Sequence, residues 1–169
     1  MNPAAAFLPT SIRCLVLPLG DWRLLVPNAA VAEIIGYQES SHLHQASPWL
    51  LGFQTWRGLP LPVLDLVQSF IELPLMGASY RARVVVCRTL NQDPQLSHIG
   101  IFSKGIPKLA LVSPETLMSS DYRMPEGSLV PWVCQLAGQT ALIPDFDAVE
   151  RQLKAESAYQ ATQEAIIYR

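Results

Sequence analysis

GFQTWRGLPLPVLDL, residues 52–66, is the stretch that decides the fold. Its first five residues suit a pleated apolar surface, Arg57-Gly58 marks a tight turn, and an extended apolar run follows. Pro60 and Pro62 have no N–H to donate, so the second strand must lie at a sheet edge or at a barrel corner. Asp65 then ends the strand and can cap a following helical turn. The stretch therefore predicts a hairpin of two short strands.

Upstream of this hairpin, two short extended runs are joined at Gly20-Asp21, which is a two-residue hairpin signal. Asn28 follows and can cap a helix over residues 29–35. That helix would leave Glu33 at its margin and bury three apolar side chains on one face, those of Val31, Ile34 and Ile35. Ser47-Pro48 has the residue order of a helix start and predicts one helical turn.

Downstream of the hairpin, short apolar runs alternate with Gly and Pro turns. Asp145 can cap a last, amphipathic helix from Phe146 to about Ala161. Many short strands and few long helices are typical of the all-β barrel class. The expected strands cover residues 83–90, 99–102, 109–112, 129–135 and 140–143.

Composition limits the class of protein. A chain of 169 residues is long enough for one domain with a real core, and half of its residues are apolar. The net charge is −2, so no basic field exists that would hold nucleic acid. Residues 1–11 predict a flexible tail without a positive leader, and no apolar run reaches the roughly 18 residues of a membrane span. We therefore expect a cytoplasmic protein with no direct membrane insertion.

No motif indicates catalysis. The sequence has no nucleophile elbow and no glycine-rich phosphate loop, and its carboxylates are explained by capping or by loops. His42 and His44 have a spacing that metal sites sometimes use, but no further ligand lies near, so a solvated loop is favoured. His98 is interpreted in the same way. We expect no enzyme activity, no catalytic residue, no cofactor and no metal, and three buried cysteines at Cys14, Cys87 and Cys134.

WRGLPLPVLDL resembles the hallmark segment of the CheW family, the small adaptors of bacterial chemosensory arrays. The element V-x-E-I is present as Val31, Glu33 and Ile34, and the likeness covers about residues 12–153. The resemblance implies two small SH3-like five-stranded β-barrel subdomains packed together, with short connecting helices. The domain would span residues 12–153, and residues 154–169 would form a C-terminal helix or tail.

The family likeness also implies a function, a non-enzymatic scaffold that couples chemoreceptors to a CheA-type histidine kinase. The partners would be the kinase regulatory domain and the chemoreceptor cytoplasmic tip, in arrays at the membrane. The resemblance places the kinase contact at Arg57 and Gly58, and it predicts that Arg57 pairs with Glu33. As a solvated turn residue Arg57 would contribute about 0–1 kcal/mol through any ion pair, whereas breaking a partly desolvated pair would cost up to about 3 to 5 kcal/mol. The receptor face is expected near the groove between the barrels, with Val31, Ile34, Pro62 and Val63.

The second half departs from the family pattern. Phe102-Ser103 stands where the family usually has Val-Asp. The chain is most similar to the auxiliary adaptors of type IV pilus, or twitching-motility, chemosensory systems. Two alternatives stay open: a CheW-like modifier that binds only one array partner, and a small-barrel module that binds another ligand.

Overall fold

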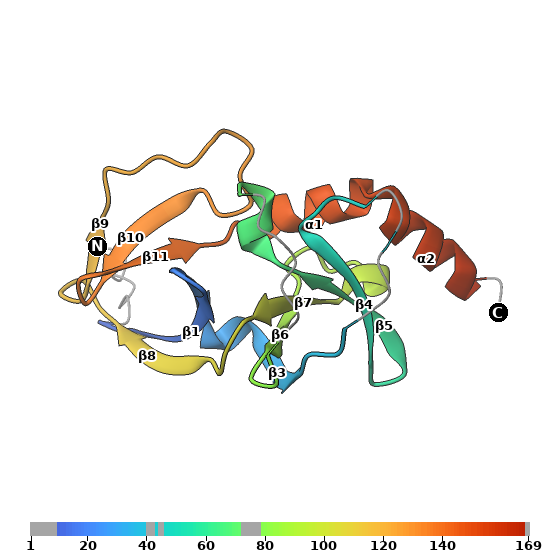
Figure 1. The fold of residues 1–169 in the computed structure, drawn as a ribbon, viewed down its shortest axis with the longest axis horizontal. Coiled ribbons are helices and arrows are strands. Elements are labelled where there is room, and N and C mark those ends of the chain that lie inside the picture. Colours follow the sequence, from blue (N-terminus) through green and yellow to red (C-terminus); the bar gives the residue numbers. More distant parts are fainter. Residues whose placement is uncertain (1–9, 40–42, 44–45, 72–78, 168–169) are drawn as a thin grey trace, which may run out of the picture.

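Two curled β-sheets lie side by side, and two C-terminal helices run along one side of the second sheet (Figure 1). This computed structural model describes residues 10–39, 43, 46–71 and 79–167, so most of the predicted N-terminal tail lies outside the described residues. The elements are β1 (Ile12–Leu19), β2 (Trp22–Pro27), η1 (Asn28–Ala30), β3 (Val31–Gly36), β4 (Leu50–Trp56), β5 (Leu59–Leu64), η2 (Leu66–Ser69), β6 (Arg83–Arg88), η3 (Pro94–Leu96), β7 (His98–Ser103), β8 (Lys108–Val112), β9 (Leu117–Ser119), β10 (Trp132–Leu136), β11 (Gln139–Ile143), α1 (Phe146–Ala155) and α2 (Ser157–Ile167).

The first sheet has the strand order β8-β1-β2-β11-β10-β9. Two antiparallel hairpins, β1–β2 and β10–β11, meet through a parallel contact between Leu24 and Leu142. The sheet has six strands where the resemblance implied five, because Leu117–Ser119 pairs with β10. Its interior is a small apolar cluster around the buried residues Cys14, Leu25 and Val112.

The second sheet has the strand order β3-β6-β7-β5-β4 and the five strands that the resemblance implied. β5 pairs with β7 only at Val63 and Leu64. The preceding half of β5, which contains Pro60 and Pro62, has β4 as its one strand neighbour. The strand as a whole is therefore not an edge strand, because β5 lies between β7 and β4, but the missing N–H groups of Pro60 and Pro62 lie where no second ladder needs them.

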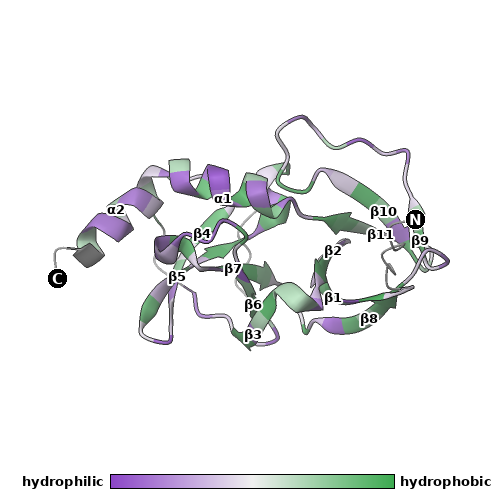
Figure 2. Cartoon of the chain, turned by 180° about the vertical axis from the view of Figure 1, so that it is seen from behind, coloured by the Kyte–Doolittle hydropathy of each residue, from purple (hydrophilic) through white to green (hydrophobic). Residues whose placement is uncertain are grey.

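The main core lies between the two sheets and under α1. Figure 2 shows hydrophobic residues along most strands and hydrophilic residues along α1 and α2. Asp145 caps α1 as predicted, since its side chain accepts a hydrogen bond from the Ala148 N–H at 3.0 Å. Asp65 likewise accepts from the Val67 N–H at 3.2 Å, at the start of η2. The last helix continues beyond the predicted end but is interrupted at Glu156.

The predicted helix over residues 29–35 is wrong. Only Asn28–Ala30 forms a helical turn, and Val31–Gly36 is strand β3, which pairs with β6. The branched side chains of Ile34 and Ile35 suit a pleated strand. The neighbouring strand supplies hydrogen bonds that cannot be predicted from residues 29–35 alone.

The helical turn predicted at Ser47-Pro48 is also wrong. The Leu50 N–H donates to the Ser47 carbonyl at 2.9 Å in a reverse turn, and the chain passes directly into β4. Within the described part of the chain, no helix has both the length and the hydrophobicity to cross a bilayer.

Candidate partner-binding site

The second sheet closes into a barrel through side chains. Strands β3 and β4 are its two edges, and Gln54 of β4 reaches across to the end of β3. Its side-chain nitrogen donates to the Gly36 carbonyl at 2.8 Å, and its side-chain oxygen accepts from the Gln38 N–H at 3.1 Å. Gln54 is 7% exposed, and these two hydrogen bonds satisfy its buried side-chain amide. This bridge holds the β4–β5 hairpin against β3.

The β4–β5 turn presents Arg57 and Gly58 to solvent. Gly58 has φ +80°, as the sequence predicted, and Arg57 also lies in the left-handed region at φ +50°. Two positive φ values define a type I′ turn, whose twist matches that of the flanking strands. A non-glycine residue in this region costs about 1–2 kcal/mol. Arg57 is therefore held in a strained backbone conformation at an exposed tip.

Five side chains meet beside this turn, namely Glu33, Trp56, Arg57, Arg88 and His98, and we call them the Trp56 cluster. Glu33 Oε2 accepts from Trp56 Nε1 at 2.8 Å and from Arg57 Nη2 at 3.3 Å. The Arg57 guanidinium lies 4.6 Å from the centre of the indole ring. The His98 ring lies 4.7 Å from the same indole. Arg88 Nη1 donates to the Val31 carbonyl at 3.4 Å.

An irregularity in β3 aims Glu33 at the cluster. The register with β6 shifts between Val31, which faces Cys87, and Glu33, which faces Val86. Ala32 is therefore an extra residue on β3, and such bulges redirect the side chains that follow them. The Val31 carbonyl at this bulge is the group to which Arg88 donates.

The predicted contact between Glu33 and Arg57 is confirmed, but the energy attached to it is not. The two side chains are 43% and 68% exposed, so solvent screens the pair. Exposed ion pairs contribute about 0–1 kcal/mol, well below the 3 to 5 kcal/mol of a desolvated pair. The pair also joins a strand to the hairpin, where the sequence had predicted a helix.

His98 is one residue of the cluster that sequence reasoning missed, and Arg88 is another. His98 faces Arg88 across β6 and β7, and its ring is partly buried against Trp56. Burial first, then the charges of Arg88 and Arg57, lower the pKa of His98 from its ordinary value. A lone histidine beside an isoleucine carries no local sign of this environment, because all of these contacts are distant in sequence.

The other proposed contact residues lie at different depths. Ile34 is 43% exposed and Val31 is half-buried. Pro62 and Val63 are buried in the second barrel, so their side chains are not accessible in this structure. Leu59, which the sequence reading did not single out, is 62% exposed beside the Arg57-Gly58 turn.

Aromatic, arginine and leucine side chains gather beside the Arg57-Gly58 turn. Among the described residues, no three His, Cys, Asp or Glu side chains lie together in a way that could hold a metal ion; His42 and His44 lie outside the described residues. Burial raises the pKa of the Cys87 thiol to about 12, so it is no nucleophile at neutral pH. The half-buried Trp56 and the exposed Arg57 are of the residue types that are enriched at protein interfaces.

Comparison with known proteins gives two findings. The model of the CheW-like domain matches residues 13–153 of the chain. Among solved structures, the crystal structure of the scaffolding protein TtCheW from Thermoanaerobacter tengcongensis is similar, with a TM-score of 0.64 and 14% sequence identity over 85% of this chain and 90% of that one. A search of curated protein sequences finds no match. On the extent of the family match, the chain belongs to the CheW-like domain family.

Proposed function

We propose that this protein is a non-enzymatic scaffold that couples chemoreceptors to a CheA-type histidine kinase. The observation that carries the proposal is the Trp56 cluster, in a chain whose residues 13–153 match the CheW-like domain. Arg57 and Gly58 form the exposed tip of a rigid hairpin, and the adjoining Trp56 is oriented by Glu33. A fixed aromatic and arginine pair binds a partner with little loss of side-chain freedom.

The kinase regulatory domain is the proposed partner of this tip. Its contact would include Glu33, Trp56, Arg57, Gly58 and Leu59. Buried surface at or below about 1,200 Å² is typical of transient signalling contacts, and a few aromatic and arginine side chains carry most of their binding energy. Two such contacts on one scaffold raise the effective concentration of each partner for the other, so modest affinities suffice for an array.

The receptor tip is the proposed partner of a second, apolar face. Ile34 is exposed on β3, and Leu109 and Leu111 of β8 are 64% and 60% exposed. Leu109 lies opposite Leu15 across β1 and β8, and Leu15 belongs to the main core. The exposed leucines of β8 therefore lie next to a strand that enters this core. Val31 would lie at the rim of the apolar face, while Pro62 and Val63 would act by shaping β5.

Cytoplasmic arrays of the type IV pilus class are the proposed setting. This chain has Phe102-Ser103 where the family usually has Val-Asp, and this difference supports an auxiliary rather than a standard adaptor. Phe102 packs edge-on against Tyr37 at 4.8 Å, and the fully buried Ser103 hydroxyl donates to the Gly105 carbonyl at 2.8 Å. The same exchange favours the second candidate, a modifier that binds only one of the two partners.

Affinity measurements against both partners test the proposal. We would measure the Kd of the full chain for a kinase regulatory domain and for a receptor tip fragment by calorimetry. Arg57→Ala should weaken kinase binding at least about tenfold, as expected of an interface arginine, and leave receptor binding unchanged. Leu111→Ser should do the reverse.

Arg123→Ala is the matched control, because Arg123 is an exposed arginine in the β9–β10 connection, which belongs to neither proposed face. Binding to one partner alone would make the protein a modifier. Binding to neither would contradict the coupling function and leave a small-barrel module for another ligand.

A further inference from the structure

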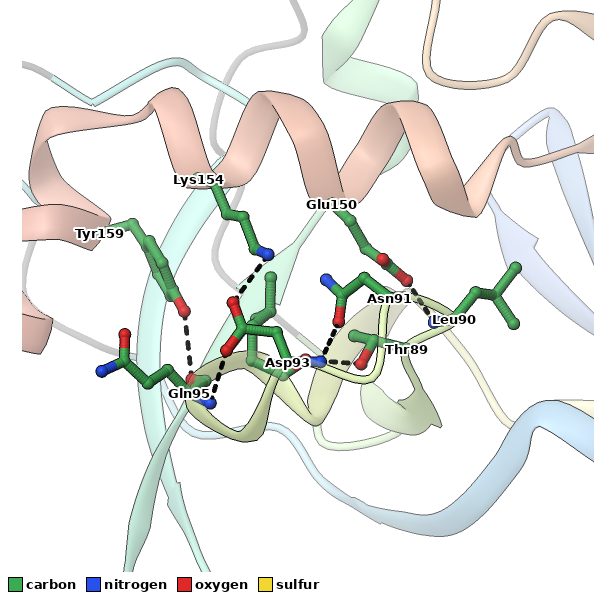
Figure 3. Close-up of polar contacts among 9 residues, drawn as sticks. Thr89, Leu90, Asn91, Asp93, Gln95, Glu150, Lys154 and Tyr159 are labelled. Atoms are coloured by element: carbon green, nitrogen blue, oxygen red, sulfur yellow. Dashed lines mark hydrogen bonds and ion pairs between the residues drawn. The ribbon is translucent and has the colours of Figure 1, made fainter.

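The C-terminal helices contact the connection between β6 and β7, residues 89–97, as Figure 3 shows. Glu150 and Lys154 are four residues apart on α1 and so share one face of the helix. Glu150, only 3% exposed, accepts a hydrogen bond from the Leu90 N–H at 2.6 Å. Lys154 Nζ lies 2.7 Å from Asp93. Helix α1 is thus attached to the first half of the connection.

Helix α2 contacts two segments at once through Tyr159. The Tyr159 side chain is 5% exposed, and its hydroxyl donates to the Gln95 carbonyl at 3.2 Å (Figure 3). Its ring stacks on Phe53 of β4, with ring centres 6.4 Å apart and planes inclined by 22°. One buried side chain therefore joins the β6–β7 connection to the β4–β5 hairpin.

Both segments lead to the Trp56 cluster over the same short distance. Phe53 is three residues before Trp56, and Gln95 is three residues before His98. The connection is braced internally, because the Thr89 N–H donates to the Ser97 carbonyl at 3.0 Å. The Gln95 backbone is therefore linked to His98 by a short, hydrogen-bonded connection.

We propose that Tyr159 is a positioning residue for the Trp56 cluster: by holding Phe53 and Gln95 together, α2 sets how the His98 ring packs on Trp56. The consequence for kinase affinity rests on the proposed function, whereas the packing itself does not. Coupling of this kind travels through contiguous packed and hydrogen-bonded groups, and it requires a direct measurement at the distant site.

The test uses full-length variants and NMR of the free protein. Tyr159→Leu removes both the stack and the hydrogen bond, while Tyr159→Phe removes only the hydrogen bond. The indole N–H resonance of Trp56 should shift and the pKa of His98 should rise toward its ordinary value, most in Tyr159→Leu. The Kd for the kinase regulatory domain should rise about two- to thirtyfold.

Two controls separate positioning from general loss of stability. Val112→Ala opens a cavity in the first barrel, where Val112 is 7% exposed in the separate small cluster, and should leave the Trp56 resonance and the His98 pKa unchanged. Glu164→Gln lies on the exposed side of α2 and should change neither signal. Unchanged Trp56 and His98 signals in a folded Tyr159→Leu protein would overturn the inference. Failure of the wild-type chain to bind the kinase domain would instead contradict the proposed function, with the NMR result still deciding the role of Tyr159.

Discussion

Trp56 and Glu33 are joined by a hydrogen bond of 2.8 Å between the indole N–H and a carboxylate oxygen, and this contact is shorter than the 3.3 Å ion pair that Arg57 makes with the same oxygen. Glu33 lies on one edge strand of the second sheet and Trp56 on the other. The carboxylate therefore serves both to close the barrel and to orient the side chains of the exposed tip.

Double-mutant cycles should rank these two contacts. For Glu33→Ala with Arg57→Ala, we expect a coupling free energy below about 1 kcal/mol, because both side chains are exposed. For Glu33→Ala with Trp56→Phe, a coupling of about 1 kcal/mol or more is expected, since a hydrogen bond to a charged acceptor exceeds a screened ion pair. Urea unfolding supplies the free energies, and added salt should reduce the first coupling. A Glu33–Arg57 coupling near 3 kcal/mol would contradict the exposed geometry.

Arg57→Asn should separate folding stability from binding. Asparagine tolerates φ +50° better than arginine, so the turn should gain about 0–1 kcal/mol after loss of the weak ion pair. Kinase affinity should fall at the same time. Ala137→Asn is the matched control, because Ala137-Gly138 forms the same type of turn, at φ +49° and +77°, in the first barrel. This control should gain stability with no change in affinity, and a stability loss in both variants would refute the turn assignment.

Gly100→Ala should destabilise the second barrel. A Cβ at Gly100 would lie 2.6 Å from Val84 Cγ1 and 3.3 Å from the Pro62 carbonyl oxygen, at the point where β5 meets β7. Overpacking of this kind costs about 1–3 kcal/mol or more. Gly36→Ala is the control, since nothing lies within 4 Å of its Cβ position. Denaturant midpoints should fall for the first variant and stay within experimental error of wild type, or rise, for the second.

His98 should make folding stability depend on pH on the acid side of neutrality. The folded state lowers the pKa of His98 from 6.5, so it favours the neutral ring. The corresponding stability is present above pH 6.5 and is lost as pH falls toward the folded-state pKa. The unfolding free energies of the wild-type protein and of His98→Gln, measured at several pH values, give the contribution of His98 to stability. Equal acid sensitivity in both proteins would show that protonation of other groups governs it.

Local sequence chemistry was sufficient for two hairpin turns and for the caps at Asp65 and Asp145, but not for the helix starts predicted at Asn28 and Ser47. The Gly20-Asp21 and Arg57-Gly58 hairpins form as predicted, because a positive φ is needed there and glycine supplies it. Asp65 and Asp145 cap as predicted, because the group that each one satisfies lies within three residues. The two groups in each of these interactions lie within a few residues of each other, so the interaction does not depend on a distant strand.

The helix predicted at residues 29–35 shows the limit of that reasoning. A run of apolar residues after an Asn is compatible with either a helix or a strand. Pairing with strand β6, about fifty residues away, makes this segment a strand. The likeness of the R-G hairpin to a known family predicted the pairing of Glu33 with Arg57. No local pattern could predict that the pair would be exposed, since exposure depends on how the barrel closes.

The sequence by itself thus determined the two hairpin turns, the caps at Asp65 and Asp145 and the β class, because these follow from backbone preferences and short-range hydrogen bonds. Only the tertiary structure decided that Gln54 closes the second barrel, that His98 packs on Trp56 and that Tyr159 joins Phe53 to Gln95. The physical reason is the same in each case: the partners are 16 or more residues apart, and their contact exists only once two curled sheets and a C-terminal helix have packed together.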